Sequence, residues 1–289
     1  MQILINSVVS GLSLGLLAMA FSLVYLPTRI FHVALGAIFT AVPFFVWQLL
    51  RYNWPAPLAV CFGLGAGLGL SMLSDIFNHS PLQRKGASPV VHFVASLGAY
   101  LVTIQSVILI WGNDSKILRV GIDAVVKIGS IVITRSQIVA AGVAVLTVGI
   151  LLSWIRFSKL GLQFRALADN PTELALRGYN LKRLKLLAFG VSGLIGSISS
   201  LLISLDLGFS ARGGLNALVI AVVSVIIGGR RSYIGPLLGA LLLTVVRSEV
   251  VWFTSAKWEI PVTFAILALA LFLRPNGFLS RNVRLEAQL

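Results

Sequence analysis

Long apolar runs separated by short polar connections dominate the sequence. Each run is close to the roughly 20 residues that an α-helix needs to cross about 30 Å of hydrocarbon. The pattern predicts an all-α, polytopic transmembrane helical bundle of about eight or nine spans, forming a single domain over residues 1–289. The nine runs are 3–26, 30–50, 56–75, 90–111, 137–155, 186–206, 214–229, 232–253 and 258–274.

The number of spans depends on the segment around Arg230 and Arg231. The two flanking runs are either separate spans or one broken, re-entrant element, which would leave eight spans. The connection at 112–136 is rich in Val and Ile and alternates weakly in polarity. A small β-hairpin or a simple covering loop is equally expected there.

Composition narrows the class of protein. The chain is 57% hydrophobic and 11% charged, with a mean hydropathy of +0.96, whereas soluble domains carry about 25% charged residues. The net charge of +14 does not indicate nucleic-acid binding, because the basic residues lie in the short connections between apolar runs. The single cysteine, Cys61, allows no internal disulfide, and no cluster suggests a metal site.

The connection at 156–185 sets the predicted orientation. Its seven basic and two acidic residues give seven minus two, or +5, which favours the cytoplasmic side. With nine spans, the N-terminus and the loop at 112–136 would lie outside, and the C-terminus in the cytoplasm. The charged residues are Arg156, Lys159, Arg165, Arg177, Lys182, Arg183 and Lys185 against Asp169 and Glu173.

Within this connection the sequence predicts a helix of about two turns. Asn170 is a good N-cap, Pro171 is tolerated at the first position, and Glu173 can reach back to the cap amide. Gly178 is suited to end the helix. Such a short helix is not stable alone in water, so it is either a docking element that packs against a partner or a solvated connector.

The same stretch carries a family resemblance. Arg165, Ala166, Ala168, Asp169 or Asn170, Ala175 and Gly178 follow approximately the pattern R-A-x-A-x-(D/N)-x-x-x-A-x-x-x-G. The chain resembles, over essentially its whole length, the inner-membrane permease subunits of ABC importers for branched-chain amino acids. The broader family also serves amides, urea and, more distantly, sugars. Tyr179 stands where the family has an aliphatic residue.

Two further motifs carry the resemblance. Residues 226–240 look like the family's G-G-x-G-S-x-x-G-P-x-x-G, with Arg231 in place of a glycine, and 273–279 match its C-terminal ending. Glycines there would permit a tight turn between membrane segments. By contrast, 32–37 keeps only Ala34 and Gly36 of the family's N-F-A-H-G-E. The residues expected to form the glycine turn are Gly228, Gly229, Ser232, Gly235, Pro236 and Gly239.

The resemblance implies a transport subunit rather than an enzyme. It implies a second related permease, two cytoplasmic ATPase subunits, an extracytoplasmic solute-binding protein, and a bacterial inner-membrane location. We expect no cofactor in this chain, and ATP would be hydrolysed by the partner, since no phosphate-loop motif G-x-x-x-x-G-K-[ST] occurs. The residues that would contact the ATPase are Arg165, Asp169, Asn170, Pro171, Glu173, Ala175 and Gly178.

The expected solute is a branched-chain or other amino acid. Urea, an amide or a sugar is the alternative within the family, and a non-ABC secondary transporter or channel is the alternative outside it. A membrane-embedded enzyme would need acidic or polar clusters at span depth, and the chain has only 9 acidic residues.

Isolated polar residues within or beside the spans are the remaining candidates. Gln105 and Asn216 would line the solute path or form hydrogen bonds between helices. His32 and His92 lie near predicted span ends, where an interfacial anchor is expected more often than a ligand or proton carrier.

Overall fold

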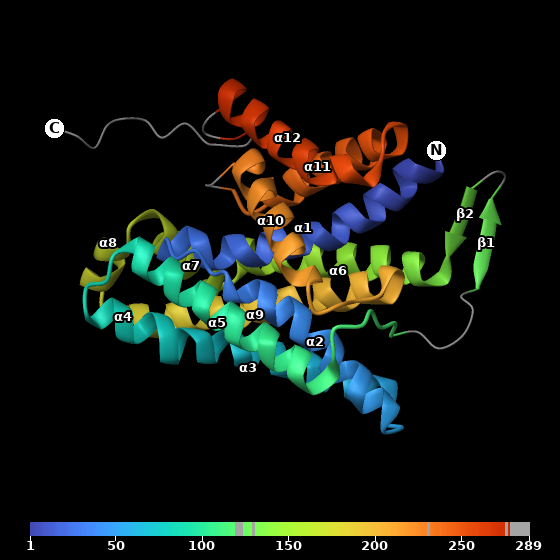
Figure 1. Ribbon diagram of the computed structural model, residues 1–289. Coiled ribbons are helices and arrows are strands. Elements are labelled where there is room, and N and C mark those ends of the chain that lie inside the picture. Colours follow the sequence, from blue (N-terminus) through green and yellow to red (C-terminus); the bar gives the residue numbers. More distant parts are fainter. Residues whose placement is uncertain (119–123, 129–130, 230–231, 275–276, 278–289) are drawn as a thin grey trace.

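The computed structural model describes the chain except for residues 119–123, 129–130, 230–231, 275–276 and 278–289. It is a helical bundle with one small β-hairpin, as the apolar pattern predicted (Figure 1). In the described part, eight helices are long and apolar enough to cross a membrane. They are α1 (Gln2–Thr28), α2 (Ala34–Arg51), α3 (Ala56–Ser74) with its extension to Arg84, α5 (Pro89–Trp111), α6 (Arg135–Phe157), α9 (Leu181–Leu207), α11 (Gly235–Phe253) and α12 (Glu259–Leu273) with the turn before it.

The remaining predicted span, 214–229, corresponds to the shorter helix α10 (Gly213–Gly228). Its 16 residues would extend about 24 Å at 1.5 Å per residue, less than the roughly 30 Å of a hydrocarbon core. Helix α10 packs against α11 as the first arm of a helical hairpin. Arg230 and Arg231, on which the span count depended, lie outside the described residues.

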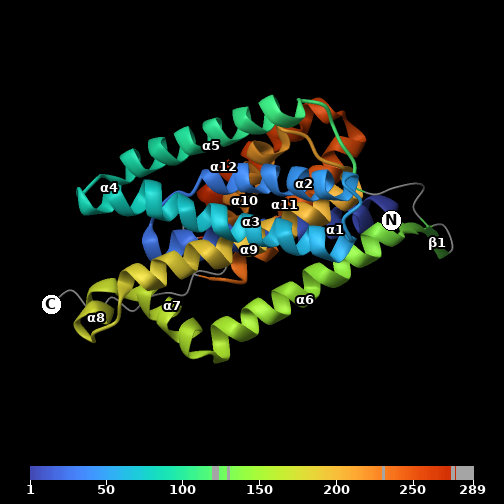
Figure 2. The same ribbon diagram turned by 90° about the horizontal axis from the view of Figure 1, so that it is seen from below.

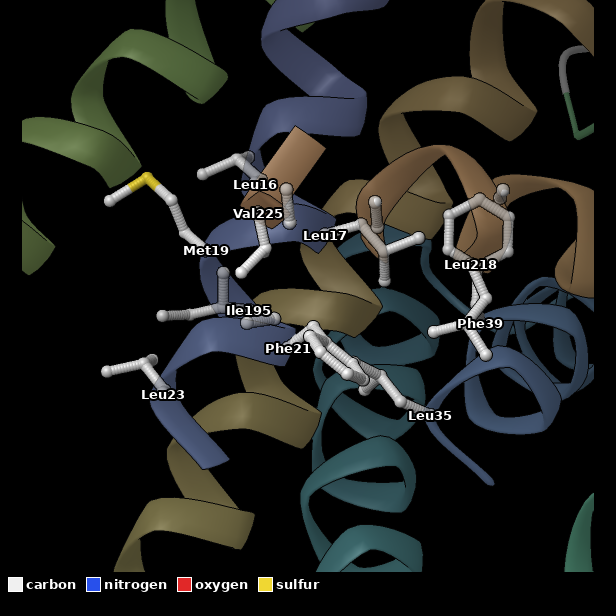
Figure 3. Packing of buried hydrophobic residues seen from close by; sticks show 14 of the residues in the cluster. Leu16, Leu17, Met19, Phe21, Leu23, Leu35, Phe39, Ile195, Leu218 and Val225 are labelled. Atoms are coloured by element: carbon white, nitrogen blue, oxygen red, sulfur yellow. The ribbon is translucent and has the colours of Figure 1, made fainter. Parts of the chain in front are cut away.

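Helix α1 occupies the centre of the bundle. It packs against α9, α11, α10 and α6, and Figures 1 and 2 show it surrounded by the other helices. Its second half supplies most of the largest buried side chains of the main core (Figure 3). The core residues labelled there are Leu16, Leu17, Met19, Phe21 and Leu23 of α1, Leu35 and Phe39 of α2, Ile195 of α9, and Leu218 and Val225 of α10.

Serine hydroxyls fasten α9 to its neighbours. Ser192 Oγ donates to the Ala20 carbonyl at 2.7 Å, and Ser199 Oγ donates to the Ser13 carbonyl at 2.6 Å. Ser200 Oγ also donates to the Phe39 carbonyl of α2. A hydroxyl buried in the bilayer must find an acceptor, and small residues allow the close approach that these bonds require. Helices α1, α2 and α9 are therefore joined by side chain–to–backbone hydrogen bonds.

A β-hairpin precedes α6 and supports one of the two expectations for this connection. β1 (Val125–Ile128) and β2 (Ile131–Thr134) pair antiparallel, which confirms the hairpin rather than the simple covering loop. The side chain of Gln2 accepts from the Val132 amide at 2.8 Å and donates to the Val132 carbonyl at 2.7 Å. The hairpin and the start of α1 therefore share one end of the bundle (Figure 1).

The segment at 156–185, predicted as a loop with one short helix, contains more helix than expected. It holds α7 (Lys159–Asp169), α8 (Pro171–Leu176) and the first turn of α9. Helix α7 forms because Ser158 caps it, accepting from the Gly161 amide at 2.8 Å, and because Phe164 and Leu167 bury its inner face. Figures 1 and 2 place α7 and α8 at the end of the bundle opposite the hairpin.

The helix that contains α3 also runs further than predicted. It passes through a π-helical turn at Asp75–His79 and the short helix α4 (Ser80–Arg84) before Gly86 ends it with φ of 67°. The last turn before α12 is a 3₁₀ turn at Ala256–Trp258.

Candidate functional site

Helix α8 has the boundaries that its sequence predicts. The side-chain oxygen of Asn170 accepts from the Glu173 amide at 3.1 Å, and Pro171 occupies the first helical position. The helix ends at Leu176, and Gly178, two residues on, has a φ of 84° in the left-handed region that favours glycine. The Tyr179 amide then donates to the Leu174 carbonyl at 3.3 Å. Local capping chemistry therefore accounts for both ends of α8.

The side chain of Glu173 does not reach back to the cap amide, and that part of the prediction was wrong. The Asn170 amide donates to the Ala166 carbonyl at 2.9 Å instead, because Asn170 also ends α7. Glu173 accepts from Arg177 Nη2 at 2.6 Å, and both side chains are more than half exposed. A surface pair of this kind contributes at most about 0.5 kcal/mol to helix stability.

Tertiary packing stabilises α8. Leu174 is buried against Leu167 of α7 and Leu184 of α9. On the other side, Leu176 and Tyr179 are exposed, with Leu176 84% accessible. A groove of about 350 Å³ separates α7 from α8 and carries both apolar and charged side chains. The outward surface of α7 and α8, with Leu162, Glu173, Leu176, Arg177 and Tyr179, is called the loop surface below.

The residues expected to contact the ATPase divide into two groups. Asn170, Pro171, Glu173, Ala175 and Gly178 lie exposed in or beside α8.

Arg165 and Asp169 belong to α7, and their charges lie close enough to Tyr233, in the connection between α10 and α11, to affect its pKa. Arg165 Nη2 donates to the Arg156 carbonyl at 3.3 Å. Burial raises the pKa of Tyr233, as does the negative charge of Asp169, whereas Arg165 lowers it. Tyr233 belongs to the glycine motif at 226–240. The structure therefore brings this motif close to the family motif that begins at Arg165.

The glycine motif forms the contact between α10 and α11. A side chain at Gly228 would collide with the backbone of Gly235, and one at Gly239 would collide with the Ser224 carbonyl. Only hydrogen at these positions allows the two backbones to approach so closely.

The connection between the two helices completes this turn. Gly229 has φ of 106° and its carbonyl accepts from the Ser232 amide at 3.3 Å. Ser232 Oγ accepts from the Gly235 amide at 3.1 Å, and Pro236 follows at the start of α11. Gly277, with φ of 82°, packs against Gly229. The rest of the C-terminal motif from Pro275 to Leu279 lies outside the described residues.

The two residues predicted to line the solute path, Gln105 and Asn216, lie in different surroundings. Gln105 is on an exposed face of α5. Asn216 lies in the first turn of α10 and lines a cavity of about 260 Å³ between α10, α11 and α12. Gln105 does not line this cavity.

The three histidines of the chain gather in one buried cluster that sequence reasoning missed. His79 Nδ1 and His92 Nδ1 are 3.3 Å apart, and the ring of His32 lies edge-on to His79 with centroids 5.8 Å apart. The expectation that His32 and His92 are interfacial anchors was wrong, because the continuation of α3 past Ser74 brings His79 against both. Burial, and then the charge of His79, hold the pKa of His32 well below its usual value.

This histidine cluster is not arranged as a metal centre. Over the described residues, no group of three or more His, Cys, Asp or Glu side chains is placed to hold a metal ion. No spacing in the sequence marks the cluster, since His32, His79 and His92 come from three separate segments.

Comparison with known proteins identifies the family. The model of the family described as "Branched-chain amino acid transport system / permease component" matches residues 3–273. The chain belongs to this permease family. It is an ABC permease, a multi-span membrane component of a transport system.

The relatives of this permease differ in their solutes. The high-affinity branched-chain amino acid transport system permease protein BraD of Pseudomonas aeruginosa is 24% identical, over 97% of this chain and 96% of BraD. The fructose import permease protein FrcC of Rhizobium meliloti is 27% identical, over 80% of this chain and 66% of FrcC.

A solved structure shares the fold of the permease. PsaBC from Streptococcus pneumoniae in complex with Fab superposes with a TM-score of 0.54 at 12% identity, over 96% of this chain and 93% of that one. At this identity the likeness concerns the fold alone.

Proposed function

We propose that the permease imports a small amino acid, branched-chain or otherwise apolar, across the bacterial inner membrane. It would pair with a second, related permease and work with two cytoplasmic ATPase subunits and an extracytoplasmic solute-binding protein. The similarity to BraD, which extends over almost the full length of both chains, supports an amino acid. The chain itself would supply the path and no ATPase site.

The observation that carries the proposal is the loop surface. Helix α8 is fixed from behind by Leu174, yet presents Leu176 and Tyr179 to the exterior beside a charged pair. A rigid short helix with apolar and charged side chains on its free side is suited to fit a groove on another protein. The sequence resemblance assigns that partner as the ATPase.

An electrostatic interaction behind the loop surface would supply a route for motion. When ATP draws the two ATPase subunits together, α7 and α8 would move with them. Asp169 and Arg165 of α7 lie within electrostatic range of Tyr233. The hairpin of α10 and α11, locked by its glycine contacts, would then move as one unit. The path between the paired permeases would open alternately to each side.

The proposed orientation follows from charge. The end that carries α7 and α8 faces the cytoplasm, because this segment holds the +5 excess of basic residues. The hairpin and the N-terminus, which share the other end of the bundle, face outward. With nine spans, the C-terminus would lie in the cytoplasm.

Substitution of Gly178 tests the docking role. Gly178→Val forces a branched residue into a left-handed conformation, at a cost of about 1–2 kcal/mol, and should distort the end of α8. In purified, reconstituted importer, ATP hydrolysis should continue while solute uptake falls. The matched control is Gly86→Val, because Gly86 also has a positive φ and free space around it but lies outside the loop surface.

Two results would count against the proposal. Equal uptake per ATP hydrolysed in Gly178→Val, Glu173→Ala and the control would remove the docking role. Recovery of the permease without an ATPase that carries a phosphate loop would indicate a secondary transporter or channel.

The second candidate solute is a sugar, since FrcC is a fructose import permease of similar identity. Uptake of labelled leucine and fructose by the same reconstituted importer separates the two. Uptake of fructose alone would contradict the amino-acid assignment and leave the transport role intact.

A further inference from the structure

The cavity that contains Asn216 is built from three helices at one end of the bundle. It is lined by the first two turns of α10, by α11 and by the first turns of α12, and its volume is about 260 Å³. Sites for drug-sized ligands hold about 300–1,000 Å³, so this cavity suits a small solute. Helix α9 runs from beside α8 to the Gly208–Arg212 connection, so the cavity lies at the end opposite the loop surface.

Charged side chains in the lining give the cavity an excess of positive charge. Arg247 of α11 forms an ion pair with Glu259 at the start of α12, and the Arg247 side chain is only 16% exposed. Arg212 lines the cavity and is exposed, and it has no ion-pair partner among the residues that the structure describes. Two arginines against one glutamate leave a charge of +1.

The rest of the lining is mainly apolar. Leu215, Val219, Ile220, Ile260 and Phe264 supply hydrocarbon surface, and the neutral polar groups are Asn216 and Thr263. A ligand complementary to this lining has a charged head with a carboxylate at one end and a hydrocarbon body at the other.

We propose that this cavity binds an apolar α-amino acid on its way through the permease. The Arg212 guanidinium binds the carboxylate, for which its planar fork of donors is suited. Glu259, held by Arg247, faces the ammonium group, and the apolar wall receives the side chain. Asn216 and Thr263 complete the polar contacts of the head group. The assignment rests on the amino-acid import proposed above and adds the site.

The lining disfavours a neutral sugar. Every hydroxyl of a sugar needs a hydrogen-bond partner when it leaves water, and an unpaired one costs about 1–3 kcal/mol. The apolar wall offers none, so the hydroxyls of fructose that face this wall would stay unpaired.

Thiol labelling tests the site directly. Leu215→Cys and Asn216→Cys, each in a Cys61→Ser background, are made in the whole importer in right-side-out membrane vesicles. The rate ratio of an anionic to a cationic methanethiosulfonate reagent should be higher at these cysteines than at a control cysteine outside the cavity, because the cavity is positive. Millimolar L-leucine should slow both reactions, whereas leucinol, which lacks the carboxylate, and fructose should not. Ser255→Cys, exposed beside α12 but outside the cavity, is the control that leucine should leave unchanged.

Substitution of Arg212 tests the role of its charge. Arg212→Gln should raise the leucine concentration that protects Leu215→Cys about tenfold or more, as expected for loss of a charge-assisted hydrogen bond. The matched control is Lys257→Gln, because Lys257 is an exposed basic residue at the same end that does not line the cavity. It should leave protection unchanged.

The outcomes separate this site from the wider function. Leucine uptake without protection at either cysteine overturns the site alone. Absence of both uptake and protection overturns the site together with the amino-acid assignment. Protection by phosphatidylglycerol in nanodiscs without leucine, lost in phosphatidylcholine, assigns the cavity to a lipid head group and also overturns the proposal. Equal protection in Arg212→Gln and wild type rejects the role of the guanidinium.

Discussion

Single residues decide how closely the helices of this permease approach one another. Gly239 of α11 faces the Ser224 carbonyl of α10 with no room for a methyl group. Gly142 of α6 lies on an exposed face with free space around it. Both are helical glycines in apolar runs, so only the structure tells which one is required by packing.

Substitution by alanine should separate these two glycines. Gly239→Ala should destabilise the permease by about 1–3 kcal/mol, the usual cost of forcing an extra group into a packed site. Gly142→Ala should be neutral or slightly stabilising, because alanine is the better helix former. Thermal unfolding of the purified permease in detergent measures both, and equal melting temperatures would contradict the close contact at Gly239.

Burial of His32 predicts a dependence of stability on pH. Its pKa is lowered in the folded protein by burial first and by His79 second, so below about pH 6.5 the unfolded chain binds a proton that the folded chain does not. Stability from this group is therefore complete above about pH 6.5 and is lost as pH falls toward the lowered pKa. The melting temperature should fall more between pH 8 and pH 5.5 in the wild type than in His32→Gln.

Other titratable groups lie near His32, so the pH dependence of the wild type alone would not isolate the contribution of His32. His79, His92, Asp75 and Lys185 lie around the same cluster, and only the difference between wild type and His32→Gln isolates His32. Identical pH profiles for the two proteins would contradict the prediction.

Features that depend only on neighbouring residues in the sequence, such as helix ends, were predictable. Asn170, Pro171 and Gly178 fix the ends of α8 through their own backbone preferences, and the structure agrees. That Glu173 does not reach the Asn170 amide was not predictable, because it depends on whether α7 ends at the residue that begins α8. The meeting of His32 with His79 was also hidden, because it depends on the packing of distant segments and on the π-helical turn at Asp75–His79.

At the scale of elements, hydroxyl groups link helices that are otherwise held by apolar contacts. Ser192 and Ser199 bond to carbonyls of α1, whereas Ser106 of α5 bonds to Val102 in its own helix and lies exposed. Apolar runs predicted the existence of these helices well. They did not predict which helices pair, since a hydrocarbon surface matches lipid and protein equally.

Removal of the interhelical serine bonds should weaken the packing of α9 on α1. Ser192→Ala with Ser199→Ala should destabilise the permease by about 1–2 kcal/mol, because each such bond contributes about 0.6 kcal/mol or somewhat more in membranes. Ser106→Ala is the matched control and should change stability little. Unfolding in a denaturing detergent measures the difference, and equal effects would show that the bonds add nothing to packing.

Across the whole molecule, the hydropathy of a helix does not indicate how much of that helix is buried in the bundle. Windows of α1 and α5 have the same hydropathy of 2.0, yet 83% of the α1 window is buried and only 22% of the α5 window. The sequence therefore predicted a helical bundle but not which helix lies at its centre. Apolar faces on α3, α5, α6 and α12 are exposed on this bundle and are available to lipid and to the second permease proposed above.

Tyr233 tests whether the loop surface and the α10–α11 hairpin move together. Its ring packs on the main core, and it lies near Asp169 and Arg165. Tyr233→Ala should lower uptake per ATP hydrolysed a few-fold, the usual size of a coupling change of about 0.5–2 kcal/mol. Tyr233→Phe keeps the ring and should couple like the wild type. A full effect in Tyr233→Phe would instead make the hydroxyl essential.

The central place of α1 has a consequence for how the protein is made. Helix α1 is synthesised before the helices it packs against, and its main partner α11 begins more than 200 residues later, at Gly235. At about 5–20 residues per second, the interval is on the order of 10–40 s. For most of it, until α9 is synthesised, the α1 carbonyls that accept from Ser192 and Ser199 wait without their donors. The nascent permease must keep its first helix accessible near the insertion machinery until the last third of the chain arrives.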